Sequence, residues 1–355
     1  MAHGQSGAEV LAVVMRSVFT PLVHSVYEQG GFVTGFAGDA FTAVFPEGKG
    51  QLPAPMPALT AAKQIQQHMA HNHRQETRFG AFEFSAKVGL ARGESIWGII
   101  SSKDGKRATY YFSGSAIDGC AEAESHALAT EIVLSNTFYE AVQQKVVVDS
   151  VNGHWRVQHI KGPLSPPKPV ANPAVNIDLA SRFTPQYLLE RQIEGEFRQI
   201  LNLFIGLQGT PSQEELGSFM QDVFRLQNQY SGFLNRIDFG DKGCHLLLFW
   251  GAPLSHEYDL AHVLDFILEL KQASTIPIRA GITYRIAHAG MIGSELAEEY
   301  TCYGRGVNLA ARQMTSAGWG EIWLDDETAQ RAVTDFVVEA IGSKIFKGFA
   351  EAQPV

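Results

Sequence analysis

At 355 residues, the chain is long enough for two domains that each bury a core of their own. Hydrophobic residues make up 45% of the sequence and charged residues 18%, a balance that is typical of a folded protein and excludes an intrinsically disordered one. The net charge is −9, with 37 acidic against 28 basic side chains and no cluster of lysine and arginine, so DNA and RNA are not expected partners.

Cysteine usage and hydropathy indicate the cellular setting. The three cysteines, Cys120, Cys244 and Cys302, are far apart and form no C-x-x-C pair, so neither a zinc site nor a disulfide framework is expected. We find no apolar stretch approaching the roughly 18 to 20 residues that span a bilayer, and the N-terminus lacks the layout of a signal peptide. The sequence therefore predicts a soluble, cytoplasmic protein without a membrane partner.

A proline-rich stretch, Lys161–Pro173, divides the sequence near its middle. Proline lacks the amide donor and fixes φ, so this stretch is expected to be a linker rather than a helix or a central strand. The predicted organisation is a first domain over residues 1–160, a linker over 161–185 and a second domain over 186–355.

The two halves present the same order of predicted elements, which indicates an internal repeat. In chain order, a hairpin around a Gly/Asp turn at Gly31–Phe45 matches a second one at Gly232–Phe249. Two β-rich runs separated by a polar turn follow at Lys87–Ser101 and again at Arg279–Ser294, and each is predicted to be a hairpin.

A strand, a glycine and a helix then follow Tyr110 and recur from Tyr300, at a constant offset of 190 residues. This pattern predicts an α+β fold: a mostly antiparallel sheet with flanking helices, built twice and packed as a pseudo-symmetric pair.

Asp39 is the first candidate functional residue. It follows Gly38 at the tip of the first predicted hairpin, where an exposed carboxylate can bind Mg²⁺. An aspartate that merely forms a type I′ turn explains the same pattern equally well.

Asn308 and Arg312 are four residues apart on the helix predicted after Gly304, so their side chains share a face. An amide and a guanidinium together suit a developing phosphoryl charge. In an arbitrary helix, a locally bonded asparagine and a solvated arginine are the commoner explanation.

The pattern across the repeat favours the functional explanation. The first half has the turn aspartate, but Asp118 and Glu122 stand where the second half has Asn308 and Arg312. The second half has that pair but no matching turn aspartate. Head-to-tail packing would therefore bring Asp39 together with Asn308 and Arg312 at one working site and leave the related site without its chemistry.

The motifs FAGDAF at 36–41, KVGL at 87–90 and YTCYGRGVNLAAR at 300–312 resemble the class III adenylyl/guanylyl cyclases, and most closely the soluble, bicarbonate-type members with tandem catalytic domains. The resemblance covers residues 7–355. It implies two ferredoxin-like cyclase homology domains that form cAMP from ATP and release pyrophosphate, with Mg²⁺ or Mn²⁺ as cofactor. ATP is the implied partner.

The resemblance also assigns roles. It implies that Asp39 holds metal, that Asn308 orients the ribose and that Arg312 stabilises the transition state. It further implies a triphosphate contact from Lys87, which an exposed edge-strand lysine would equally explain. By the same resemblance, Arg236 and Thr301 recognise the base. Position 236 carries arginine where the adenylyl members have lysine, so a guanylyl cyclase is an alternative.

Further departures from the family's pattern concern its metal site and its bicarbonate site. The family's second metal aspartate lies on an opening strand, which we expect to precede Met1, and the matching position of the second half is Gly206. The basic residues of the bicarbonate site correspond to Gly35 and Ala121, so activation by bicarbonate is not expected. We also expect the chain to be part of a longer protein.

Two alternatives of another class remain open. A degenerate cyclase pair could bind a nucleotide or a small anion and regulate a partner region without turnover. A general α+β interaction module related to RNA-recognition domains is disfavoured by the acidic charge and the lack of their aromatic motifs.

Overall fold

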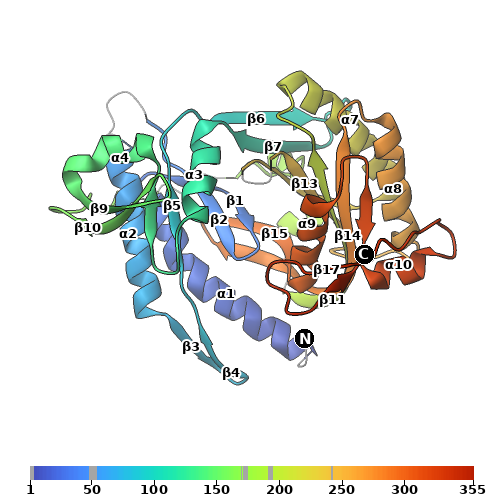
Figure 1. The fold of residues 1–355 in the computed structure, drawn as a ribbon, viewed down its shortest axis with the longest axis horizontal. Helices are drawn as coiled ribbons and strands as arrows, with labels where there is room; N and C mark the ends of the chain where they lie inside the picture. Colours follow the sequence, from blue (N-terminus) through green and yellow to red (C-terminus); the bar gives the residue numbers. More distant parts are fainter. Residues whose placement is uncertain (1–3, 48–53, 169, 171–174, 191–194, 241–242) are drawn as a thin grey trace.

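The structure is a computed structural model that describes residues 4–47, 54–168, 170, 175–190, 195–240 and 243–355. Its described part combines helices with sheets whose strand pairs are mostly antiparallel, which confirms the predicted α+β class. Figure 1 shows the N-terminal half, blue to green, beside the C-terminal half, yellow to red.

The C-terminal half begins with a β-α-β-β-α-β unit. Its elements are β11 (Glu196–Leu207), α7 (Gln213–Tyr230), β12 (Phe233–Asp238), β13 (His245–Trp250), α8 (Asp259–Ala273) and β14 (Ile278–Ser294). The strands lie in the order β12-β13-β11-β14, all antiparallel. The first and last strands of the unit are therefore neighbours, which is the ferredoxin-like arrangement predicted for this half.

Further elements extend that sheet. They are β15 (Ala297–Tyr303), α9 (Arg305–Ser316), β16 (Ile322–Leu324), α10 (Asp326–Ala332), β17 (Ser343–Lys344) and β18 (Gln353–Pro354). The hairpin predicted within Arg279–Ser294 is wrong, because β14 is one continuous strand of 17 residues. Its first part pairs with β11 and its last part with β15, so the polar residues in its middle do not form a turn.

The N-terminal half has the predicted helices and the first hairpin, but its sheet is divided. Its elements are α1 (Gly4–Tyr27), β1 (Phe32–Ala37), β2 (Ala40–Val44), α2 (Pro55–His71), β3 (Arg74–Thr77), β4 (Gly80–Glu83), β5 (Val88–Leu90), β6 (Ile96–Ser101), β7 (Ala108–Ser113), α3 (Ser115–Ser125), β8 (Ile132–Leu134), α4 (Asn136–Val142), η1 (Gln143–Lys145), β9 (Val146–Val151) and β10 (His154–Ile160). Among the described residues, strands β1 and β2 pair only with each other, apart from the sheet β5-β8-β10-β9.

The hairpin predicted over Lys87–Ser101 is also wrong. Strand β5 pairs in parallel with β8, and β6 pairs with β7 instead. The polar residues between β5 and β6 thus separate two different sheets.

The same local contacts recur in both halves. A Cβ built on Gly89 would lie 2.4 Å from the Cys120 carbonyl oxygen, and one on Gly281 would lie 2.2 Å from that of Ala310. Strands β5 and β8 pair in parallel, as do β14 and β16. The residues that cap α4 and α10, Ser135 and Asp325, are 190 positions apart, the offset found in the sequence.

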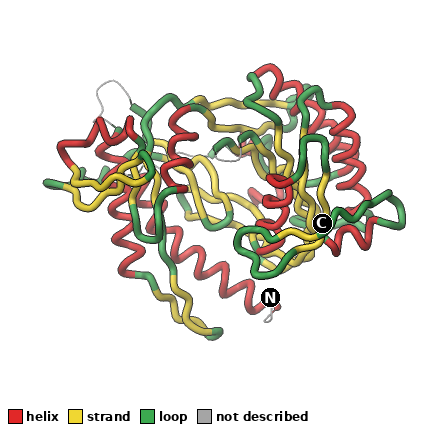
Figure 2. Tube along the Cα trace, in the orientation of Figure 1, coloured by secondary structure: helices red, strands yellow, loops and turns green. Residues whose placement is uncertain are grey.

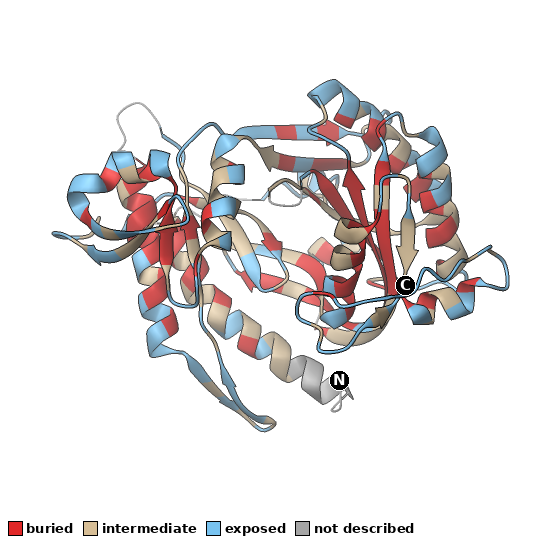
Figure 3. Cartoon of the chain, in the orientation of Figure 1, coloured by how far each residue is buried: buried red, intermediate tan, exposed pale blue. Residues whose placement is uncertain are grey.

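The larger core belongs to the C-terminal sheet, whose strands are the most deeply buried part of Figure 3. Leu201, Leu203 and Ile205 of β11 face helices α7 and α8. Ile200 and Phe204, which alternate with them, face the side covered by α9. In the N-terminal half, a separate cluster joins α2, β8 and α4.

Each half extends elements over the other. The hairpin β6–β7 reaches the C-terminal core, where Ile100 and Tyr111 pack with α7 and α8 residues. In return, Ile292 of β14 packs against Phe19 and Val23 of α1. Figures 1 and 2 show the β6–β7 hairpin running along the top of the view to α7 and α1 running beneath the sheet.

The predicted linker contacts the N-terminal half and contains a short helix, α5 (Ile177–Ala180); another short helix, α6 (Gln186–Glu190), begins directly after it. The Ser165 amide donates to Thr60 Oγ1 at 3.1 Å, and the Lys168 amide donates to the Glu28 carbonyl at 2.6 Å. Part of the predicted linker, residues 169 and 171–174, lies outside the described residues. The domain boundaries remain a prediction.

Helix α1 differs from the hydropathy expectation. Its segment Val10–Tyr27 has a mean hydropathy of 1.5 over 18 residues, enough by length and composition to cross a membrane. Such helices also occur in soluble proteins, and here Phe19 and Val23 are buried against the sheet and Val26 against α2. This single helix is weak evidence for a membrane span.

Candidate functional site

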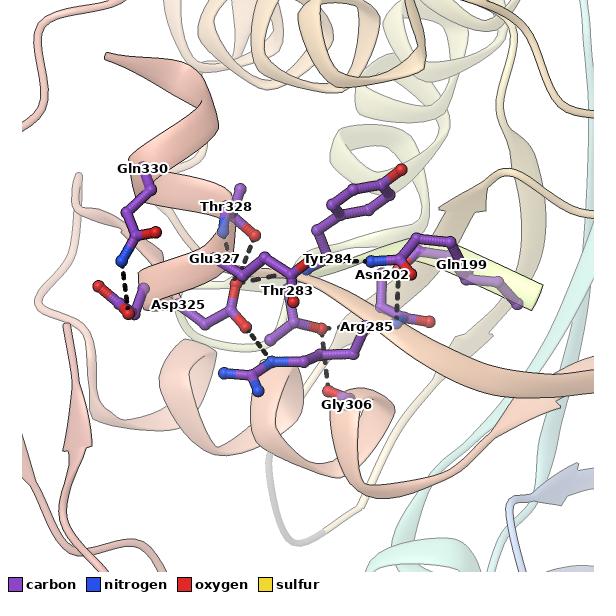
Figure 4. Close-up of polar contacts among 12 residues, drawn as sticks. Gln199, Asn202, Thr283, Tyr284, Arg285, Gly306, Asp325, Glu327, Thr328 and Gln330 are labelled. Carbon is purple, nitrogen blue, oxygen red and sulfur yellow. Dashed lines mark hydrogen bonds and ion pairs between the residues drawn. The ribbon is translucent and has the colours of Figure 1, made fainter. Parts of the chain in front are cut away.

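Helix α9 carries the predicted Asn308 and Arg312, and close contact with β14 fixes its position. Gly304 precedes the helix with φ of 147°, a conformation that favours glycine. Gly281 lets the backbone of α9 lie directly on β14, because a Cβ there would be 2.2 Å from the Ala310 carbonyl oxygen. The Thr283 hydroxyl of β14 donates to the Gly306 carbonyl at 3.0 Å (Figure 4).

A buried aspartate fixes the neighbouring helix α10. Asp325 is 1% exposed and caps α10 by accepting from the amide of Thr328 at 3.1 Å. It also forms an ion pair with Arg285 of β14 and accepts from the Tyr284 amide, as Figure 4 shows. Strand β14 is therefore hydrogen-bonded both to α9 and to the residue that caps α10.

Asn308 and Arg312 are not engaged elsewhere. Asn308 is exposed and Arg312 is half-buried. In the described part of the chain, neither side chain has a hydrogen bond or an ion pair; only their backbone groups are bonded. An amide and a guanidinium, one helical turn apart, are thus free to bind a polar ligand.

Asp39 lies at the turn between β1 and β2, after Gly38 with φ of 66°. Its carboxylate is exposed and has no hydrogen bond or ion pair among the described residues. The hairpin is anchored to the other half, because the Phe36 amide donates to Glu299 Oε2 at 3.1 Å. Glu299 is on β15, the strand that leads through Gly304 into α9.

The residues present fit one divalent cation held jointly by the protein and the phosphate groups of a ligand. Mg²⁺ is commonly bound by one or two carboxylates together with phosphate oxygens, and Asp39 offers one carboxylate. Gly206 supplies no second ligand, and a Cβ built on it would lie only 2.7 Å from Met314 Sδ, which fills the space above its Cα. A site for two metal ions is not assembled from the described residues around Asp39.

Lys87, the predicted triphosphate contact, is engaged within its own half. Its Nζ lies 2.8 Å from Glu124 Oε1 and donates to the Glu124 carbonyl at 3.3 Å. Glu124 is on α3, so this pair joins the start of β5 to that helix. Lys87 must leave Glu124 before it can contact a nucleotide.

Arg236 and Thr301, the predicted base contacts, belong to a buried polar network. Arg236 Nε is 2.5 Å from Asp238 Oδ2, and its Nη1 is 3.7 Å from Glu299 Oε1. The Thr301 hydroxyl donates to Asn235 Oδ1 at 2.9 Å, and Asn235 Nδ2 donates to Glu299 Oε1 at 2.7 Å. The two residues therefore lie close together, joined through Glu299 and Asn235.

Burial governs the charges in this network. Desolvation raises the pKa of the Glu299 carboxyl, although Arg236 and the Phe36 amide oppose that shift. For Arg236, burial lowers the pKa but Asp238 and Glu299 outweigh it, so the guanidinium pKa is raised. Arg236 thus stays a cation, while Glu299 takes up a proton more readily than an exposed glutamate.

The related hairpin of the C-terminal half is packed rather than open. A Cβ on Gly240, in the β12–β13 turn, would lie 3.4 Å from Ala121 Cβ of α3. The rings of Phe239 and Tyr111 lie 5.4 Å apart beside it. By contrast, a Cβ on Gly38 would meet no described residue within 4 Å. One hairpin turn thus contacts the helix of the other half, while the turn with Asp39 is open.

Gly35 and Ala121, which stand at the positions of the family's bicarbonate site, carry no positive charge. Ala121 faces Gly240, and the nearest group to a Cβ on Gly35 is the Glu299 carboxylate, at 3.8 Å. An anion gains no cationic partner from either residue.

Sequence reasoning missed Glu299 and Asn235, which hold Arg236 and Thr301 in place. Their signal was weak: Glu299 is one of two adjacent glutamates, and Asn235 directly precedes Arg236 in LNRIDF. A cavity of ≈ 550 Å³ opens beside this network, with Asn235, Tyr110, Arg107 and Asp259 among its lining residues. None of the predicted site residues lines it.

No family model matches the chain. Curated proteins do: adenylate cyclase type 10 of Homo sapiens is 24% identical over 408 residues, an alignment that covers 98% of this chain and 24% of that protein. The rabbit protein, from Oryctolagus cuniculus, is 23% identical over 402 residues with the same coverage. The chain thus spans about a quarter of the length of these relatives, and the predicted resemblance to soluble adenylyl cyclases is confirmed.

Solved structures similar to the chain are cyclase domains. The adenylyl cyclase CyaB from P. aeruginosa has 19% sequence identity and a TM-score of 0.42, covering 46% of this chain and 94% of its own. The guanylyl cyclase Cya2 has 22% identity and a TM-score of 0.39, covering 45% of this chain and 91% of its own.

Proposed function

We propose that the chain is the catalytic region of a nucleotide cyclase, which forms cAMP from ATP and releases pyrophosphate at one site between the Asp39 hairpin and α9. The observation that carries this proposal is the alignment of 98% of the chain with adenylate cyclases. In this proposal, residues 1–160 and 186–355 are tandem cyclase homology domains, and the protein works in the cytoplasm.

Two side chains of α9, Asn308 and Arg312, would carry out the catalytic roles. Asn308 would hydrogen-bond the ribose and so hold its 3′-hydroxyl towards the α-phosphorus, which lowers the entropic part of the barrier. Arg312 would donate to the phosphoryl oxygens as charge develops on them. Since neither side chain has another partner in the described residues, neither must break a contact to do this.

Asp39 would hold Mg²⁺ or Mn²⁺ together with the phosphates of the substrate. Bound there, such an ion would offset the negative charge of attacking and leaving oxygens. The exposed carboxylate of Asp39 at an open turn supports this role.

Base recognition by Arg236 and Thr301 requires a change in the buried network. The Thr301 hydroxyl donates to Asn235 and keeps its lone pairs for the amino group of adenine. Arg236 would donate to adenine N1 only after turning away from Asp238. A guanidinium also suits the edge of guanine, so GTP is the alternative substrate.

A second candidate function is nucleotide or anion binding without turnover. Two of the six proposed site residues favour it over turnover, because Lys87 and Arg236 are paired with protein carboxylates that they must leave before they contact a nucleotide. In that case the pair of halves would act as a regulatory module of the longer protein.

Turnover of ATP distinguishes the two candidates. The full-length natural protein is incubated with ATP and Mn²⁺, and cAMP and pyrophosphate are measured for the wild type and for Arg312→Ala. Loss of a cation that stabilises a phosphoryl transition state typically lowers the rate by about 10³-fold or more. Arg305→Ala, an exposed arginine in the first turn of the same helix, is the matched control and should retain activity.

A wild type that binds ATP but forms neither product would reject the cyclase and support the binding module. Equal activity of Arg312→Ala and Arg305→Ala would reject the role of Arg312.

A further inference from the structure

A second cluster of ligand-type side chains lies away from Asp39, Asn308 and Arg312. Glu122, His126 and His154 each offer one ligand atom, and these atoms all lie within 4.8 Å of one another. Among the residues that the structure describes, no other group of three or more His, Cys, Asp or Glu side chains meets this condition.

The fold brings these residues together from distant parts of the N-terminal half. Glu122 and His126 are four residues apart at the end of α3, so they share a face. His154 is the first residue of β10, directly after the turn formed by Asn152 and Gly153, which both have positive φ. The rings of His126 and His154 lie 4.8 Å apart, centroid to centroid.

Hydrogen bonding leaves one nitrogen of His154 free for a metal. Its Nδ1 is 3.3 Å from the Asn152 carbonyl oxygen, which can only accept, so Nδ1 carries the proton and Nε2 the lone pair. A backbone carbonyl that fixes the tautomer in this way is the usual second partner of a metal-bound imidazole. The Asn152 Nδ2 amide, 3.4 Å from His126 Nδ1, can only donate, so His126 holds its lone pair on Nδ1 and can offer that nitrogen to a metal once it releases Asn152.

We propose that Glu122, His126 and His154 bind a divalent transition-metal ion of the zinc class. Two imidazole nitrogens and one carboxylate suit Zn²⁺, Co²⁺ or Ni²⁺, whereas Mg²⁺ and Ca²⁺ prefer oxygen ligands. Three protein ligands leave a fourth position of a tetrahedral ion to water or to a small ligand.

The required movement is small. Zinc bonds of about 2.0 Å in tetrahedral geometry set the ligand atoms about 3.3 Å from one another, so the three atoms must close in from their present spacing. Glu122 is exposed and forms no ion pair among the described residues. Its side chain can therefore turn towards the two histidine rings.

Binding would join α3 to the β9–β10 turn. Helix α3 also contacts the C-terminal half through Ala121, the neighbour of Glu122, which faces Gly240. The matching position of the C-terminal half carries Arg312 instead of Glu122, so the metal ligands are confined to the half whose helix lacks the Asn/Arg pair.

Titration of the metal-free protein with Co²⁺ tests the proposal. The full-length natural protein, stripped with a chelator and kept in excess Mg²⁺, should bind one Co²⁺ with visible d–d absorption typical of a four-coordinate ion. Glu122→Gln and His126→Asn should each weaken Co²⁺ binding by at least about tenfold, since each removes one ligand. Zn²⁺ should raise the unfolding temperature of the wild type more than that of either variant.

Two controls separate this cluster from other sites. His71→Asn removes an exposed histidine of α2 outside the cluster, and Asp39→Asn removes the carboxylate proposed to bind Mg²⁺. Both should bind Co²⁺ like the wild type. Absence of the absorption band in the wild type, or equal Co²⁺ affinity of the wild type and both cluster variants, would overturn the proposal.

Discussion

Two glycines at matching positions decide how closely a helix approaches each sheet. Gly89 lies against the backbone of α3 and Gly281 against that of α9, with the same pair of backbone atoms facing each. Any side chain there would push the helix off its strand. In the C-terminal half this contact sets where Asn308 and Arg312 are held, so a residue without functional groups positions the proposed site.

Gly281→Ala should lower the free energy of unfolding by about 1–3 kcal/mol, the usual range for overpacking a dense core. The added Cβ would lie 2.2 Å from the Ala310 carbonyl oxygen and 2.6 Å from the Met314 amide nitrogen, neither of which can turn away. Urea unfolding measures the change. Gly217→Ala in α7 is the control, because its Cβ meets no part of the chain that the structure describes within 4 Å and alanine favours a helix. It should stabilise the protein slightly.

Glu299 should make stability depend on pH. Its native pKa is raised above 4.5, mainly by burial, so the native state holds the proton more tightly than the unfolded state. The free energy of unfolding should then fall as pH rises from about 4.5 through the native pKa. Glu299→Gln should flatten this fall, measured as urea midpoints between about pH 4.5 and 7.

Glu298→Gln provides the comparison for that experiment. Glu298 is the adjacent residue, 43% exposed, and its nearest cation is Arg16 at 3.5 Å. An exposed pair of this kind contributes little. The same flattening in both variants would mean that burial of Glu299 is not the cause.

Two hydrogen bonds hold the β6–β7 hairpin to α7. Gln221 of α7 accepts from the Lys103 amide at 3.1 Å and donates to the Ser101 carbonyl at 3.0 Å. The apolar contacts of Ile100 and Tyr111 with the C-terminal core continue the same interface. This hairpin is therefore an interdomain clamp in the proposed domain organisation.

Gln221→Ala should loosen the turn of that hairpin while leaving the buried contacts of Ile100 and Tyr111. The loss of two exposed hydrogen bonds should cost about 1 kcal/mol or slightly more. Hydrogen exchange at the Lys103 amide should become faster. Gln229→Ala, on the same helix but bonded to Glu269 of α8, should leave Lys103 exchange unchanged; an equal effect would contradict the clamp.

At the scale of elements, the sequence predicted which segments are helical or extended better than how strands pair. Gly304 and the apolar face after it indicated α9 directly, because helix start signals are local. The pairing of β5 with β8, and the continuity of β14 through its polar middle, depend on contacts between residues far apart. Local turn patterns carry no information about such contacts.

At the scale of the whole molecule, the offset of 190 residues predicted a strand, a glycine and a helix at matching positions of the two halves. Asn308 and Arg312 were accessible to prediction because they share one helix face. The network around Glu299 was not, because it joins β12, β15 and β1 across the interface. The Glu122, His126 and His154 cluster left only the helical spacing of its first two members as a signal, since His154 comes from strand β10, far along the chain.

The proposed single catalytic site uses Asp39, Asn308 and Arg312 but not the matching positions of α3. Product formation from ATP by matched variants of the full-length protein tests this most directly. Asn308→Ala and Asp39→Ala should lower the rate of cAMP formation by about 10²-fold or more, whereas Asp118→Ala, at the position that matches Asn308, should leave it unchanged. A loss in Asp118→Ala as large as that in Asn308→Ala would contradict the single site.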